Sequence, residues 1–219
     1  MPKANQTRAR AGEAGFSLIE LMVALGVTLV IMVVASRMLA MSMAVRTREN
    51  QRTEAVADVQ RALQSMTRDI ANAGLGMKNN GLVDADSGPL ELRVRTNLNA
   101  FCGASAACDA DTLDPGEDIV FALIDNVDAD GKSQTLITRQ DINNSNAITQ
   151  LANRIDGLKF DFIDADGATA AAASGAQRVR ITVSVTLPAV GSSGQAGYQP
   201  ASRMWLVSEA VLRNLLLDE

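Results

Sequence analysis

Histidine is absent from the 219-residue sequence, and tryptophan and tyrosine occur once each. Without histidine, Ser-His-Asp and Cys-His catalysis and histidine metal sites are excluded, and the usual general base near neutral pH is missing. Aromatic residues make up 3 % of the chain, so surfaces that stack on sugars or bases are not expected. Glycine-rich phosphate loops, Cys-x-x-Cys pairs and nucleophile elbows are also missing. We therefore expect no enzyme activity, no catalytic residues and no cofactor.

Positive charge is scarce beyond the amino terminus. The formal net charge is −5, and residues 1–15 hold three of the 20 basic side chains but one of the 25 acidic ones. The rest of the chain therefore carries 17 basic and 24 acidic residues. Because nucleic-acid binding through counterion release needs a basic face, no nucleic-acid partner is expected.

One long apolar run is present, residues 16–36, with the sequence FSLIELMVALGVTLVIMVVAS. These 21 residues include one charge, Glu20, and are long enough to span about 30 Å of hydrocarbon at about 1.5 Å per residue. The hydrophobic core of a secretory signal peptide would be shorter and end at a small-residue cleavage site, whereas apolar character here continues to Val45. The run therefore predicts a retained membrane-spanning helix.

The carboxylate of Glu20 lies at the fifth position of this run. Insertion scales give a cost of about 2.5–3.5 kcal/mol for such a charge in lipid. The Glu20 carboxylate therefore requires a cationic partner at the same depth in the membrane. Cleavage after Gly15 would expose an amino group on Phe16 that meets this need.

The sequence of residues 15–23, GFSLIELMV, resembles the processing motif of type IV prepilins and type II secretion pseudopilins. The resemblance implies a leader over residues 1–15, cleavage between Gly15 and Phe16 by a prepilin peptidase, and N-methylation of Phe16. It further implies that Glu20 neutralises the amino terminus of a neighbouring subunit in a filament.

The same resemblance implies a location and a set of partners. The chain would be a single-pass inner-membrane protein with a cytoplasmic amino terminus before processing and a periplasmic or extracellular domain. It would later enter a pilus filament or its tip. The implied partners are other major and minor pilins, the prepilin peptidase, the inner-membrane assembly platform and membrane lipid.

A helical pattern continues beyond the membrane. Apolar residues recur at spacings of three and four, with charged residues between them, at Val56, Val59, Leu63, Met66 and Ile70. Neither proline nor glycine interrupts the pattern before Gly74. We expect one helix over residues 16–73, with a transmembrane and assembly segment at 16–45. The upper part, 46–75, should pack on an exported domain.

The remainder, residues 76–219, alternates between apolar and polar side chains and predicts a β-rich exported domain. Strands are expected at 90–95, 119–124, 135–139, 158–162, 178–187 and 204–212, and one short helical turn at 148–155. A helix followed by strands predicts an α+β fold, with an antiparallel β-sheet laid against the upper helix, as in type IV pilin-like proteins. Long connections at 74–89, 96–117, 140–157 and 188–202 are candidate partner-contact loops.

Two further segments narrow the resemblance. Residues 60–74, QRALQSMTRDIANAG, and residues 151–160, LANRIDGLKF, are similar to minor pilins of the PilW type and to the related J-type pseudopilins. This implies a structural subunit in the initiation or tip complex of a type IV pilus. The alternatives are a minor pseudopilin of a type II secretion system and an anchored surface enzyme or binding module.

The two cysteines, Cys102 and Cys108, enclose a short polar loop. Two thiolates without histidine or further cysteines cannot complete a tetrahedral zinc site. In an exported domain such a pair favours a disulfide, with free thiols as the alternative.

Three Asp-Ala-Asp units are present, and two of them are followed by glycine. Asp128 and Asp130 resemble the first half of a calcium-binding loop, but the downstream glutamate that such a loop requires is missing. Asp-Gly between alternating strands is also a common hairpin-turn signal. Turns are therefore the favoured interpretation, with a calcium site as the alternative and no other metal site expected.

Overall fold

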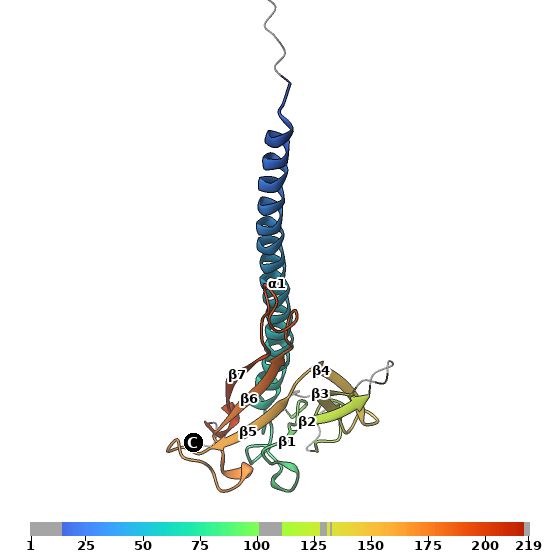
Figure 1. Cartoon of the computed structure of the whole chain (residues 1–219). Coiled ribbons are helices and arrows are strands. Elements are labelled where there is room, and N and C mark those ends of the chain that lie inside the picture. Colours follow the sequence, from blue (N-terminus) through green and yellow to red (C-terminus); the bar gives the residue numbers. More distant parts are fainter. Residues whose placement is uncertain (1–14, 101–110, 128–130, 132, 217–219) are drawn as a thin grey trace, which may run out of the picture.

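One helix forms the axis of the molecule. In the computed structural model, which describes residues 15–100, 111–127, 131 and 133–216, helix α1 (Leu18–Ala71) is 54 residues long. Its amino-terminal half projects away from a β domain that packs on its carboxyl-terminal half (Figure 1). The expected single helix is thus confirmed, with ends two residues inside the predicted bounds.

Helix α1 ends where the glycine signal predicts. Asn72 caps the last turn, and Gly74 follows with φ +73°. A Cβ atom at Gly74 would lie 2.4 Å from the Asn79 carbonyl oxygen, and its amide donates to Arg95 O at 2.9 Å. Both the left-handed backbone and the close approach require glycine here.

The predicted stripe on the upper helix is a core-packing face. Val59, Leu63, Met66 and Ile70 are buried, Val56 is half-buried, and the charged residues between them face outward or are only partly covered. Burying each large apolar side chain contributes about 1.5–3 kcal/mol. These four residues therefore fix the β domain to the helix.

The strands form two antiparallel sheets rather than one. The first has the order β1-β2-β3-β4, with β1 (Glu91–Arg95), β2 (Asp118–Val127), β3 (Ser133–Asp141) and β4 (Ala147–Ala152). The second has the order β5-β6-β7, with β5 (Gly157–Ile163), β6 (Arg178–Leu187) and β7 (Ser202–Val211). The described part of the domain also contains three short 3-10 helices, η1 (Asp84–Asp86), η2 (Ala173–Gly175) and η3 (Arg213–Leu216).

The helical turn expected at residues 148–155 is wrong. Strand β4 occupies most of this segment and pairs with β3, with Gln150 opposite Thr138. A tight turn with positive φ at Ser145 and Asn146 reverses the chain after β3. Pairing with the free edge of β3 therefore decides the conformation, and Ile148 and Thr149 suit a strand because they are β-branched.

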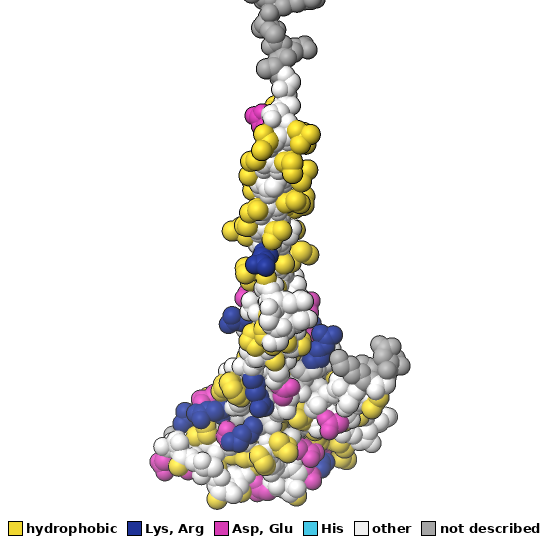
Figure 2. Space-filling view, in the orientation of Figure 1, with side chains coloured by type: hydrophobic (Ala, Val, Ile, Leu, Met, Phe, Trp, Pro, Cys, Tyr) yellow, Lys and Arg dark blue, Asp and Glu magenta, His cyan; other side chains and the backbone are white. Residues whose placement is uncertain are grey.

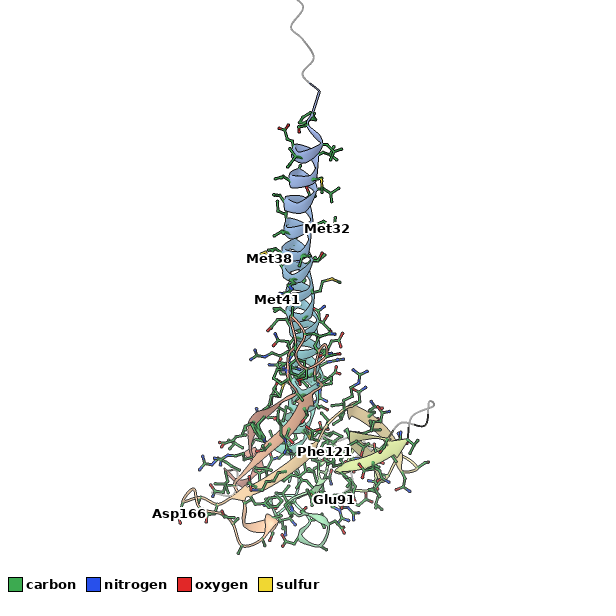
Figure 3. The ribbon with its side chains drawn as sticks, viewed as in Figure 1. Met32, Met38, Met41, Glu91, Phe121 and Asp166 are labelled. Atoms are coloured by element: carbon green, nitrogen blue, oxygen red, sulfur yellow. The ribbon has the colours of Figure 1, made fainter. Side chains whose placement is uncertain are left out.

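Both sheets and α1 share one apolar core. Phe121 of β2 and Phe160 of β5 are its largest buried side chains, and Met66 of α1 packs in the same cluster. Phe121 lies inside the domain in Figure 3, whereas Met32 and Met38 project from the free half of α1. The core thus begins only in the carboxyl-terminal half of the helix.

A buried carboxylate ties the start of β2 to β1. Asp118, with 5 % of its side chain exposed, accepts hydrogen bonds from Arg93 Nε at 2.7 Å and from Arg95 Nε at 2.9 Å. Burial raises the pKa of Asp118, but the hydrogen bonds from Arg93 and Arg95 outweigh it and hold the pKa below its ordinary value of 3.8. The ionised form is therefore the stabilising one.

The lowered pKa of Asp118 predicts that the stability of the fold depends on pH. The ionised carboxylate contributes its full stabilisation when the pH is above its ordinary pKa, and this contribution is lost as the pH falls through the folded-state pKa. We expect Asp118→Ala to lower the free energy of unfolding at pH 7 by about 2–4 kcal/mol, with a difference that shrinks below about pH 4. Thermal unfolding of the full chain in detergent across this range is the measurement.

The matched control is Asp86→Ala, which removes the exposed partner of Arg93, 2.6 Å away. An exposed pair contributes less than about 1 kcal/mol. Equal losses in the two variants at pH 7 would contradict the assignment.

Candidate processing and assembly site

The expected cleavage site lies in an extended, uncovered segment just before α1. Gly15, Phe16 and Ser17 precede the first helical residue, and 83 % of Phe16 is exposed. A Cβ atom built on Gly15 would meet nothing within 4 Å. Among the described residues nothing blocks access to this peptide bond, and a larger side chain at position 15 would be restricted only by an enzyme that binds there.

Glu20 lies in the first turn of α1 and is exposed. Among the described residues it has no hydrogen-bond or ion-pair partner. The positive end of the helix dipole favours a carboxylate in this turn, by a few tenths of a kcal/mol to about 1 kcal/mol. That is less than the cost of a charge in lipid, so a further cation is still needed.

Ser17 and Glu20 are spaced as in a capping box, Ser-x-x-Glu. This pattern marks the start of the helix at Leu18, two residues after the predicted start at Phe16. Ser17 has the extended backbone of an N-cap, but its side chain makes no cap hydrogen bond. Glu20 therefore makes no capping hydrogen bond in this structure.

The helix around Glu20 is apolar on every side. Its large apolar residues from Phe16 to Val45 are 49–83 % exposed, and Figure 2 shows them around the free half of the rod. Of the helices described, α1 is the one long and apolar enough to cross a membrane. A helix that is apolar all round needs either lipid or other helices around it.

Thr28, another polar residue of the apolar run, has its hydrogen-bond partner within the helix. Thr28 donates its hydroxyl hydrogen to Ala24 O, 2.8 Å away, within the helix. Such back-bonding satisfies the hydroxyl without any partner from outside. Glu20 is consequently the group in the span that most requires an external partner.

A loop of the β domain meets α1 around the end of the predicted transmembrane segment. Arg48 donates to the carbonyl oxygens of Pro188, at 2.6 Å, and Pro200, and to Ser202 Oγ at 3.2 Å. Gly197 has φ +87°, and a Cβ there would lie 3.0 Å from Met41 Cα. The connection at 188–202, one of our candidate partner-contact loops, is therefore docked on the helix of its own chain.

The Asp-Ala-Asp units that the structure describes are used internally. Asp84 accepts hydrogen bonds from the Ser174 hydroxyl and amide, which hold the pKa of Asp84 below its ordinary value. Asp164 Oδ1 accepts the amides of Asp166 and Ala168, and the Gly167 amide donates to Asp164 O. The turn interpretation is therefore confirmed at residues 164–167.

Three sets of predicted residues lie outside the described part of the chain. They are the leader up to residue 14, the cysteines Cys102 and Cys108, and the calcium candidates Asp128 and Asp130. Within the described ranges, no three acidic or cysteine side chains converge as a metal site would require.

Comparison with known families matches residues 10–36 to the prokaryotic N-terminal methylation motif. No curated protein matches the chain. The matched segment contains Gly15, Phe16 and Glu20 and continues through the apolar run. Together with the long apolar helix, the motif is consistent with a membrane-anchored pilin and implies pilin-type assembly partners such as a prepilin peptidase. The motif therefore indicates a protein of the type IV pilin or pseudopilin type.

Proposed function

We propose that the protein is a minor pilin, a structural subunit of the initiation or tip complex of a type IV pilus. Its leader, residues 1–15, is removed before Phe16, Phe16 is N-methylated, and α1 enters the filament from the inner membrane. The observation that carries the proposal is Glu20, which has no partner among the described residues and lies in the apolar, uncovered amino-terminal half of α1, within the methylation motif.

Assembly gives this carboxylate a partner. In a bundle of pilin helices, the Phe16 amino group of an adjacent subunit can approach Glu20 at the same depth. Opposite charges attract far more strongly in a low-dielectric bundle than in water. The apolar sides of α1 are buried against neighbouring helices in the same step.

The minor-pilin assignment is supported by residues 60–74 and 151–160, which are similar to minor pilins of the PilW type and J-type pseudopilins. In the structure the first segment is the core-facing end of α1, and the second joins β4 to β5. The second candidate function is a minor pseudopilin of a type II secretion system, which would use the same α1 chemistry.

Filament fractionation distinguishes the two functions. Shearing intact cells should release the protein together with the major pilin if it is a minor pilin. Release only with the secretion machinery, in cells whose sheared pili lack the protein, would support the pseudopilin instead.

We also propose that Cys102 and Cys108 form a disulfide. The ends of their loop are held together by Glu117, which is 1 % exposed and accepts the amides of Leu98, at 2.7 Å, and Asp114, at 3.1 Å. A disulfide between Cys102 and Cys108 would close a small ring within this loop and contribute roughly 2–3 kcal/mol.

Alkylation without reduction tests the disulfide. Mass spectrometry of the exported protein should find both cysteines unmodified before reduction and both labelled after it. Labelling of both thiols before reduction would contradict the bond.

A further inference from the structure

The outer face of the β5-β6-β7 sheet is basic and carries the one tryptophan of the chain. Register places Trp205 opposite Ser184, Val207 opposite Thr182, and Glu209 opposite Arg180 on this face. The opposite face of the sheet holds buried residues such as Ile181 and Val183 and packs on the core. The outer face is therefore exposed along β7, whereas at Arg178 it adjoins the turn at Gly167, where an added Cβ would lie 3.7 Å from Arg178 Nη2.

Its apolar residues are exposed to an unusual degree. Trp205 is 62 % exposed, Val207 57 % and Val211 51 %. The guanidinium of Arg203 lies 5.7 Å from the centre of the Trp205 ring, within the range of a cation–π interaction. Tryptophan and arginine are the residues most enriched at energetically dominant positions of protein interfaces.

The charge of this face differs from that of the rest of the molecule. It carries Lys159, Arg178, Arg180 and Arg203 against two carboxylates, and each carboxylate is already paired. Lys159 binds Asp161 at 2.5 Å, and Arg180 binds Glu209 at 2.7 Å. Arg178 and Arg203 have no ion-pair partner in the described part of the chain. Figure 2 shows basic side chains gathered over this side of the β domain.

The position of this face on the molecule excludes a lipid membrane as its binding partner. The first residue of β7, Ser202, contacts Arg48 of α1, and Ser208 contacts Thr67 at 3.0 Å. Trp205 lies between these two points on the strand. Arg48 and Thr67 are three and 22 residues beyond Val45, where the predicted transmembrane segment ends, or about 5 and 33 Å along the helix. An interfacial tryptophan would instead sit at the level of the lipid headgroups.

We propose that this basic face, centred on Trp205, Arg178 and Arg203, docks an acidic surface of a different pilin-type subunit. The choice of a pilin-type subunit as the partner rests on the proposed function. Two arginines without carboxylate partners match an acidic surface, and a symmetric contact with a second copy would set arginine against arginine. Nucleic acid fits poorly, because two unpaired cations on an acidic chain give little counterion release.

Photocrosslinking of the full chain in its native membrane tests the proposal. A photoreactive residue at Val207 should give a product with a protein that carries the methylation motif and has an acidic exported domain. The same residue at Val127, which is 62 % exposed on β2, is the positional control and should give none. A product with DNA, phospholipid or a second copy of the chain would overturn the proposal, as would the absence of any product.

Substitutions provide the second measurement. Trp205→Ala, and Arg178→Glu combined with Arg203→Glu, should each lower the yield of the Val207 product about tenfold, as expected for dominant interface residues. The matched controls are Ile148→Ala, at a position 60 % exposed on β4, and Lys78→Glu, on an exposed loop. Both controls should leave the yield unchanged. Equal yields in all variants would overturn the proposal.

Cleavage and recovery in sheared pili, measured in the same cells, distinguish failure of this docking surface from failure of the proposed function. A chain that is cleaved to Phe16 and recovered in sheared pili, but gives no Val207 product, overturns the docking surface alone. A chain that stays uncleaved overturns the proposed function, and the docking proposal with it.

Discussion

Glu20→Ala is expected to enter the membrane and to be cleaved after Gly15, yet to be lost from filaments. Removing the carboxylate relieves its cost of about 2.5–3.5 kcal/mol in lipid, so insertion should be equal or slightly better. In the filament, the change leaves the amino group of an adjacent Phe16 without its partner. Breaking a buried pair costs about 3–5 kcal/mol, so incorporation should fall by roughly a hundredfold or more.

Crosslinking to neighbouring pilins and recovery in sheared filaments, at equal membrane levels, are the measurements. Glu20→Asp should retain part of the assembly, because the shorter carboxylate can still approach an ammonium group after small shifts. Leu21→Met, at the next residue, which is 60 % exposed, is the matched control, and because it conserves apolar volume it should assemble nearly as the parent does. Assembly of Glu20→Ala at the level of the parent would exclude charge pairing.

Gly15→Val should block maturation almost completely. An added Cβ atom meets nothing within 4 Å among the described residues, so neither fold nor insertion should suffer. A peptidase that must approach the backbone closely at this position would exclude it. Immunoblots should therefore show a membrane-embedded precursor that keeps its 15-residue leader.

The control for this change is Gly26→Val, within α1, where an added Cβ also meets nothing within 4 Å. That variant should be cleaved normally, because the substitution is the same but lies 11 residues beyond the cleaved bond. If Gly15→Val still matures to a Phe16 amino terminus, the motif does not direct processing in this protein.

Much of the fold could be predicted because its signals are local. The apolar stripe at Val59, Leu63, Met66 and Ile70 follows helix geometry, and Gly74 ends the helix for a steric reason visible in the sequence. The alternation in β6 likewise predicts which side chains are buried, since side chains point to opposite faces of a strand.

Other features depended on partners distant in the chain. Strand β4 was mistaken for a helical turn because its conformation is decided by pairing with β3. The division into two sheets depends on which edges meet around α1, and residue alternation carries no information about that.

The residues of the candidate site also differ in whether the sequence could predict them. Gly15, Phe16 and Glu20 belong to one short motif and could be named from the sequence. The exposure of Trp205 could not be predicted, because alternation along β7 does not say whether another element covers its outer face. The contact of Arg48 with the carbonyl oxygens of Pro188 and Pro200 joins residues about 140–150 positions apart and leaves no local signal.

Mass spectrometry of the amino-terminal peptide of the mature protein is the most direct test of the central claim. The account predicts a chain that begins at Phe16, with one methyl group on its amino nitrogen and Glu20 unmodified. A mature membrane protein that still begins with the leader, or that is cut at another bond, would contradict it.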